Sequence, residues 1–96
     1  MKKKYTKIDN IPAIIWGEDS SKVFIAIHGN QSNKEDVVIE ILAKIVVNKG
    51  YQVISFDLPK HGDRIFDDTL CKVQNCVAEL LKIYDFVSGK YNEINL

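Results

Sequence analysis

The sequence lacks the features that would place it in several functional classes. No stretch approaches the roughly 20 consecutive apolar residues of a membrane-spanning helix, and the basic stretch MKKKYTK is not followed by the apolar segment of a signal peptide. The 13 basic residues are balanced by 13 acidic ones, so no net charge favours nucleic acid or an anionic membrane. We therefore expect neither nucleic acid nor a membrane among its partners.

Cysteine is also scarce. The only two, Cys71 and Cys76, are five residues apart in a segment that the apolar spacing predicts to be helical, which would place them about 140° apart around the helix axis. At that angle the two thiols cannot reach each other, and no Cys-x-x-Cys motif or neighbouring histidine indicates zinc or redox chemistry. Two free, buried thiols fit a reducing compartment, so we expect a cytoplasmic protein.

Apart from these absences, the composition is that of a globular protein. With 96 residues, 46% of them hydrophobic, the chain is expected to form one domain over residues 1–96. Five stretches predict strands: KYTKI, IPAIIWG, VFIAI, YQVISF and the terminal EINL. Pro12 cannot donate to a ladder, which puts IPAIIWG near a sheet edge. VFIAI and YQVISF do not alternate with polar residues, which predicts strands covered on both faces of a parallel sheet.

Two segments between these strands predict helices. The first begins after Ser32, which has the capping-box spacing with Glu35, and ends before Gly50. Its expected apolar stripe comprises Val38, Ile41, Leu42, Ile45 and Val46. The second covers about residues 69–88 and ends before Gly89, with an expected stripe of Leu70, Val73, Val77, Leu80 or Leu81, Tyr84 and Val87. We therefore predict an α/β fold, a three-layer α/β sandwich whose mostly parallel sheet contains N-terminal edge strands, a βαβ unit and a second helix.

Two polar motifs follow the two interior strands. His28-Gly29-Asn30 comes directly after VFIAI, and DLPKHGDR (57–64) comes directly after YQVISF. In this order the two motifs resemble the N-terminal part of the α/β-hydrolase family of serine esterases, lipases and peptidases. In that family an HG-type loop follows the third strand, and a loop of the form Asp-x-Pro-x-His-Gly-x-Arg follows the next one. Lys60 departs from the pattern, since the family often has glycine there.

The resemblance implies that His28, Gly29 and Asn30 form the oxyanion-hole loop of a catalytic site. Acyl transfer builds negative charge on the carbonyl oxygen, and fixed backbone N–H groups stabilise that charge. Gly29 would let an ester carbonyl approach the backbone. The N–H of Asn30, together with that of Gln31, would then point at it, near the positive end of a helix beginning close to Asn33.

The remaining polar side chains of the two motifs are expected to be structural. The ring of His28 should hydrogen-bond the neighbouring loop rather than touch substrate. Asp57 and His61 should tie the second loop together, with the Asp57 carboxylate accepting backbone N–H groups. The family's triad acid and base come after the nucleophile in the chain, so neither of these residues is expected to serve as one.

The sequence contains no Gly-x-Ser-x-Gly elbow, the motif that carries the family's nucleophile directly after the strand that EINL would begin. Five serines occur, all outside that context: Ser20, Ser21, Ser32, Ser55 and Ser88. We therefore interpret the chain as the N-terminal portion of a serine hydrolase acting on ester or amide bonds, truncated before the elbow and inactive alone. The expected partners are a small ester or acyl substrate in the complete enzyme, and further copies of the chain paired through an exposed sheet edge.

Two other interpretations of the same residues exist. One is a non-catalytic module that self-associates or binds a small anionic ligand through the HGNQSNKED loop at a helix N-terminus. The other is a metal site made of His28, Asp57, His61 and Asp63, which is disfavoured because no pair of histidines has a helical ligand spacing such as H-E-x-x-H. We expect no cofactor and no metal.

Overall fold

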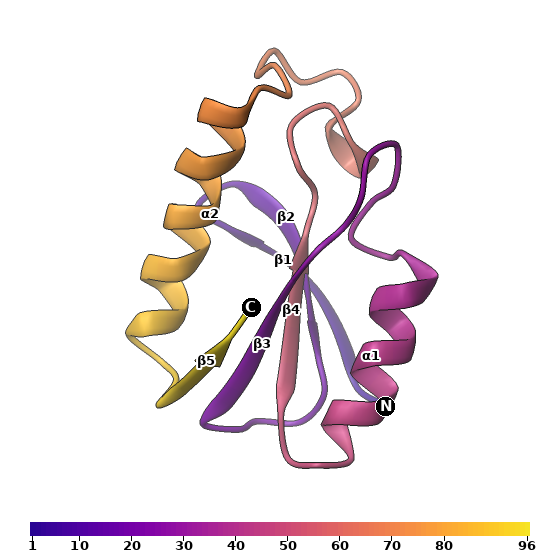
Figure 1. The fold of residues 1–96 in the computed structure, drawn as a ribbon, viewed down its shortest axis with the longest axis vertical. Coiled ribbons are helices and arrows are strands. Elements are labelled where there is room, and N and C mark those ends of the chain that lie inside the picture. Colours follow the sequence, from indigo (N-terminus) through magenta and orange to yellow (C-terminus); the bar gives the residue numbers. More distant parts are fainter.

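A computed structural model describes all residues, 1–96, as one five-stranded sheet between two α-helices (Figure 1). The elements in chain order are β1 (Lys3–Ile8), β2 (Ile11–Trp16), β3 (Lys22–Ile27), α1 (Val37–Val47), β4 (Gln52–Phe56), a single 3₁₀ turn (Gly62–Arg64), α2 (Val73–Ser88) and β5 (Glu93–Asn95). The two helices cover opposite faces of the sheet. The predicted three-layer α/β sandwich is confirmed.

The sheet has the strand order β1-β2-β4-β3-β5. β2 runs antiparallel to both of its neighbours, β1 and β4. β3 runs parallel to both of its neighbours, β4 and β5. Asp9 and Asn10 join β1 to β2 with φ angles of 49° and 66°, the left-handed conformation that a two-residue hairpin turn requires. β1 is the edge strand and β2 lies next to it, so Pro12 lies near the edge as predicted.

The apolar strands bury side chains on both faces, which explains why VFIAI and YQVISF do not alternate. One cluster packs against α2 and contains Ile8, Ile11, Ala13, Val23, Ile25, Ile54, Phe56, Ile83 and Val87. The other packs against α1 and contains Ile14, Trp16, Ala26, Ile39, Ala43, Val46 and Val53. All five residues of β4 are buried, so this strand contributes side chains to the core on both faces of the sheet.

The prediction for the first helix is wrong in its start and in its buried face. α1 begins at Val37, and its N-cap is Asp36, whose carboxylate accepts the Val38 N–H at 2.8 Å. The predicted capping box at Ser32 and Glu35 does not form, because the Glu35 N–H is already bonded to the side chain of Asn33 at 2.7 Å. α1 buries Ile39, Ala43 and Val46, whereas Val38, Ile41 and Ile45 of the predicted stripe are more than half exposed.

The second helix also begins later than predicted. Residues 69–72 precede it, because the Asp67 carboxylate holds Arg64 at 2.9 Å and accepts the Thr69 N–H, a local contact that competes with helix formation. α2 buries Glu79, Ile83 and Val87, so Val87 is the only residue of the predicted stripe that is fully buried. The exposed remainder on the helix, Val73, Val77, Leu81 and Tyr84, forms an apolar outer stripe of α2.

The prediction that the two cysteines cannot meet is wrong. Since α2 begins at Val73, Cys71 precedes the helix and the helical angle between the cysteines does not apply. Their Sγ atoms lie 3.9 Å apart. Neither thiol is fully buried, and that of Cys71 is exposed.

Several apolar surfaces have no partner within the chain. β5 pairs only with Lys22–Phe24 of β3, so the outer edge of β3 from Ile25 to Ile27 is unpaired, and 47% of Ile27 is exposed. The outer stripe of α2 and the exposed residues of α1 add further apolar area on both faces. Neither helix has the length and apolar character needed to span a membrane.

We predict that the chain self-associates, because an unpaired strand edge and apolar stripes gain stability when a second copy covers them. Sedimentation velocity should show a weight-average coefficient that rises with protein concentration. The double variant Val77→Lys/Leu81→Lys should shift the distribution towards monomer. Gln74→Lys/Ala78→Lys, which adds the same charge beside the stripe, should not. A single monomer boundary at all concentrations, without binding of a hydrophobic dye, would contradict the prediction.

Candidate functional site

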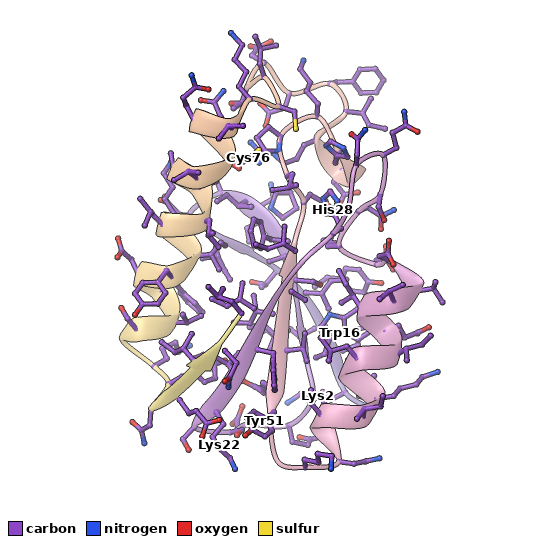
Figure 2. All side chains as sticks on the ribbon, viewed as in Figure 1. Lys2, Trp16, Lys22, His28, Tyr51 and Cys76 are labelled. Carbon is purple, nitrogen blue, oxygen red and sulfur yellow. The ribbon has the colours of Figure 1, made fainter.

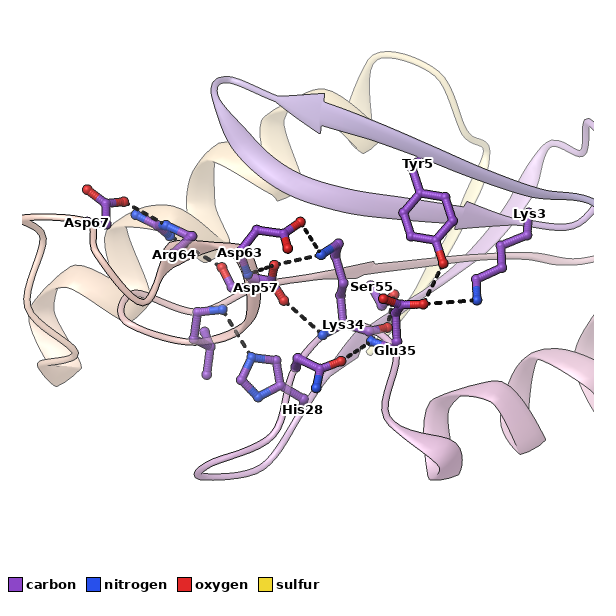
Figure 3. A network of polar contacts seen from close by, with 12 residues as sticks. Lys3, Tyr5, His28, Lys34, Glu35, Ser55, Asp57, Asp63, Arg64 and Asp67 are labelled. Carbon is purple, nitrogen blue, oxygen red and sulfur yellow. Dashed lines mark hydrogen bonds and ion pairs between the residues drawn. The ribbon is translucent and has the colours of Figure 1, made fainter.

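Two polar loops meet at the carboxyl edge of the sheet. β3 and β4 are parallel neighbours with Ile27 opposite Phe56, so the loop after β3 (28–36) and the loop after β4 (57–67) leave the sheet side by side. These are the two motifs of the sequence, and the structure brings them together. Figure 3 shows the polar contacts that join them.

The carboxylate of Asp57, which is fully buried, is the centre of these contacts. Its Oδ1 accepts the Lys34 N–H at 2.9 Å, and its Oδ2 accepts the Lys34 ammonium at 2.8 Å and the Asp63 N–H at 3.1 Å. The Asp63 N–H belongs to the second loop, as expected from the sequence, but the Lys34 N–H belongs to the first, so Asp57 joins the two loops to each other (Figure 3). A buried carboxylate is stable only when its lone pairs are satisfied, so this residue fixes the loops relative to each other.

Lys34 is the partner that sequence reasoning missed. It is 3% exposed, and its Nζ lies 2.8 Å from both Asp57 Oδ2 and Asp63 Oδ2. Burial by itself lowers the pKa of Lys34, but the hydrogen bonds to the two aspartates outweigh burial, and the net pKa is raised above its ordinary value. Its carbonyl also accepts the Ser55 hydroxyl of β4 at 2.7 Å, so backbone and side chain are both held.

Each of the two histidines belongs to one loop and bonds the backbone of the other. His28 Nε2 accepts the Leu58 N–H at 3.1 Å, and His61 Nε2 accepts the Gln31 N–H at 3.1 Å. The Nδ1 of each ring lies near a backbone carbonyl oxygen, at 2.7 Å from Gly29 and 2.9 Å from Pro59, so each ring fits the neutral tautomer with its proton on Nδ1. His28 thus bonds the neighbouring loop, as the sequence suggested, and both rings are occupied by structural contacts.

Arg64 attaches the second loop to α2. It is 7% exposed, pairs with the Glu79 carboxylate through both terminal nitrogens, with Nη2 2.9 Å from Oε2, and donates to the Asp57 carbonyl at 3.3 Å. The hydrogen bonds to Glu79 are the main cause that raises the pKa of Arg64 above its ordinary value. The pair explains why a charged residue, Glu79, is buried on the sheet-facing side of α2.

The backbone N–H of Asn30, like those of Gly29 and Asn33 in the same loop, has no hydrogen-bond partner within the chain, whereas the N–H groups of Gln31 and Lys34 are bonded. Gly29 beside it is exposed, and a Cβ at Gly29 would meet no atom within 4 Å. The backbone at Gly29 is not in the left-handed region, so neither conformation nor packing within the chain requires glycine here. Gly29 and Asn30 are both exposed, so a ligand can approach this part of the first loop from solvent.

Two details of the predicted oxyanion loop are corrected by the structure. The Gln31 N–H is bonded to His61 and cannot point at a substrate. The positive end of a helix does not lie at Asn33 either, because α1 begins at Val37 and its first turn is capped by the Asp36 carboxylate. Asn30 therefore supplies the one free amide of the predicted pair.

The four residues of the alternative metal site do not gather into a metal-binding arrangement. The structure contains no group of three or more histidine, cysteine, aspartate or glutamate side chains placed to hold an ion. The Asp57 carboxylate and both histidine rings are engaged in the hydrogen bonds described above, and Asp63 pairs with Lys34. The arrangement instead favours a role for the backbone of the first loop.

No protein-family model and no curated protein matches the sequence. Solved structures match the fold. A cold-adapted esterase from an Arctic intertidal metagenomic library gives a TM-score of 0.71 at 20% identity, over 95% of this chain and 46% of that one. Est1E from Butyrivibrio proteoclasticus, solved with bound ferulic acid, gives 0.72 at 18% identity, over 95% and 40%. The thioesterase domain from the curacin biosynthetic pathway gives 0.62 at 18% identity, over 90% and 33%.

The chain therefore has a partial α/β-hydrolase fold, as the resemblance implied. It spans less than half the length of each of these three structures. At these identities the likeness concerns the fold alone.

The two aspartates on Lys34 should differ sharply in their effect on stability. Asp57→Asn removes a buried charge from a buried cation and should lower the free energy of unfolding by about 3–5 kcal/mol. Asp63→Asn changes a partner whose side chain is 72% exposed and should cost less than about 1 kcal/mol. Urea denaturation of both variants measures the difference. Equal losses would show that Asp57 is not the centre of the network.

The pH dependence has a defined sign. The raised pKa of Lys34 means that its charged form contributes fully below the ordinary value of 10.5, and that the contribution is lost as the pH rises through the higher folded value. The wild-type protein should therefore begin to lose stability as the pH rises above 10.5.

The two motif glycines should respond oppositely to alanine. Gly62 has a φ of 55°, and a Cβ there would collide with the Asp57 carboxylate, so Gly62→Ala should destabilise the fold by more than about 2 kcal/mol. Gly29→Ala should change stability by less than about 0.5 kcal/mol, since its Cβ would meet open space. Thermal denaturation checks both variants. A large loss for Gly29→Ala would mean that the first loop needs glycine for its own conformation.

Proposed function

We propose that this chain forms the oxyanion-binding side of an ester- or acyl-hydrolysing site of the α/β-hydrolase type. The observation that supports this is the free Asn30 N–H above the open surface of Gly29, at the carboxyl end of β3. The other polar groups of this region hold the loops together. The resemblance assigns one of the two oxyanion donors to a backbone amide of this loop, and the free Asn30 N–H supports that assignment.

The chemistry that this amide can supply is limited. A backbone N–H stabilises the negative charge of a tetrahedral intermediate without any change in its own protonation. An oxyanion hole without a triad accelerates hydrolysis by only about 10³–10⁴-fold over water, and the second donor, which follows the nucleophile, has no counterpart in this sequence. We therefore infer that the nucleophile, the general base and the second donor come from residues outside this chain.

The uncovered edge of β3 is the place where such residues would pack. An apolar hollow of about 140 Å³ adjoins it, lined by Ile27, Phe56, Leu58, Cys76, Val77 and Leu80. Leu58 bonds His28 through its N–H, so the hollow borders the first loop. A strand continuing the sheet beside β3, followed by a helix on the outer stripe of α2, would cover the hollow and bring its own groups beside Asn30.

The substrate class follows from the same proposal. A small ester or acyl compound carries the carbonyl that the Asn30 amide would polarise, and its carboxylate product is the simplest probe of the site. Ferulic acid is bound to Est1E, which has the same fold, so ferulate is a suitable test ligand for this chain as well.

The proposal is tested by following backbone amides in an NMR titration with ferulate, with acetate as a smaller carboxylate. The Asn30 resonance should shift most, whereas Gln31, which is bonded to His61, should shift little. Gly29→Ala should abolish the shift by placing a methyl group in the open space above the loop. Alone, the chain should hydrolyse p-nitrophenyl acetate at the buffer rate and should not be labelled by a fluorophosphonate.

Other outcomes separate the alternatives. Saturable binding of inorganic phosphate, with no response to either carboxylate, would support the non-catalytic anion-binding module instead. Turnover by the chain alone, or shifts that leave Asn30 unmoved, would overturn the proposal.

A further inference from the structure

We propose that Cys71 and Cys76 form a redox-active dithiol that closes to an intramolecular disulfide when it meets a disulfide oxidant such as oxidised glutathione. The two Sγ atoms lie 3.9 Å apart, and a disulfide bond is about 2.0 Å long, so they need to approach by roughly 1.9 Å. Figure 2 shows Cys76 near the start of α2, at the same end of the molecule as His28. This inference does not depend on the proposed hydrolytic function.

The chain around the two sulfurs can supply that movement. Cys71 lies in the irregular segment before α2, whereas Cys76 is held in the first helical turn by its N–H bond to the Lys72 carbonyl at 2.9 Å. The helix has no side-chain cap at Lys72, and apart from the contact between the two thiols the only side-chain hydrogen bond to the adjoining residues is the one that the Asn75 amide donates to the Leu70 carbonyl at 2.8 Å. The approach therefore requires an adjustment of Cys71 and its neighbours, with the helix left in place.

The two thiols have different roles in the exchange. Cys71 is exposed and meets the oxidant first. Cys76 is half-buried, and burial first, with its hydrogen bond to Cys71 second, raises the pKa of its thiol. A thiol of this kind is slow to attack an external disulfide, but it is well placed to attack a neighbour 3.9 Å away.

The reaction is a pair of thiol–disulfide exchanges. The Cys71 thiolate attacks one sulfur of oxidised glutathione, forms a mixed disulfide and releases one glutathione thiolate. The Cys76 thiolate then attacks Cys71 Sγ, forms the Cys71–Cys76 bond and releases the second glutathione thiolate. The protein loses two electrons and two protons, and the glutathione disulfide gains the electrons and becomes two thiols.

Tryptic mapping provides a direct test, because Lys72 lies between the two cysteines. Reduced protein yields the separate peptides IFDDTLCK and VQNCVAELLK. After treatment with oxidised glutathione, these peptides should be joined, the intact chain should lack two hydrogen atoms and carry no glutathione, and both thiols should be lost to Ellman's reagent. The oxidised chain should melt about 5–10 °C higher, because the cross-link tethers the uncapped start of α2.

Single variants distinguish this sequence of steps from non-specific oxidation. Cys76→Ser should retain one glutathione on Cys71, since no second thiol can displace it. Cys71→Ser should react at least about tenfold more slowly, because only the half-buried Cys76 remains. A stable glutathione adduct on the wild-type chain, or disulfide-linked dimers in place of joined peptides, would overturn the proposal. Circular dichroism of each variant confirms that the fold is intact.

Discussion

The buried carboxylate of Asp57 is the interaction on which the two loops depend. It lies at the end of the central strand β4, where water cannot reach it, and its lone pairs are satisfied by Lys34 and by the Asp63 N–H. A buried aspartate without these donors would be strongly unfavourable, so both loops must adopt the conformations that deliver them. The same carboxylate occupies the space beside Gly62 that a side chain would need. It also accepts the backbone N–H of Lys34, which fixes the chain shortly before α1 begins. One charged group thus links the loop after β3 to the loop after β4.

The sheet could be predicted because its strands differ chemically from the rest of the chain. Runs such as VFIAI are apolar at every position, which is typical of a strand covered on both faces. The order strand, helix, strand predicted that β3 and β4 are parallel neighbours, as the structure shows. The partnership of Asp57 and Lys34 could not be predicted in the same way. Lys34 stands in the polar stretch NKED, where a lysine is normally solvated, and no local pattern marks one that is buried by a residue 23 positions away. Its role depends on the tertiary approach of the two loops.

The helices show a second limit of sequence patterns. α1 is apolar at most positions around its axis, so spacing alone does not determine which side faces the sheet. The side that packs contains Ala43, whose small side chain lets the helix approach β4 closely, and the larger Ile41 and Ile45 are left exposed. In α2 the buried side contains Glu79, which a hydrophobic pattern would assign to solvent and which is stabilised there by Arg64. In both helices the packing partner decided the face, and the apolar outer sides remain available to other segments.

The apolar surfaces and the free N–H of Asn30 are both exposed to water, and one covering segment would change the surroundings of both. An exposed N–H is satisfied by water, and in water it stabilises a developing oxyanion only weakly. It becomes an effective donor when the site around it is closed and water is excluded, because the electrostatic interaction is then much stronger. The proposal assigns one side of such a site to this chain: the loops are fixed by buried contacts, the Asn30 N–H has no partner within the chain, and an apolar hollow lies at the end of β3 before the loop. Closing the proposed site requires a segment that covers the amide. That segment would be stabilised by packing against the uncovered edge of β3 and the outer stripe of α2. The same contact that buries these apolar groups would therefore also dehydrate the amide, so assembly and catalytic competence would arise together.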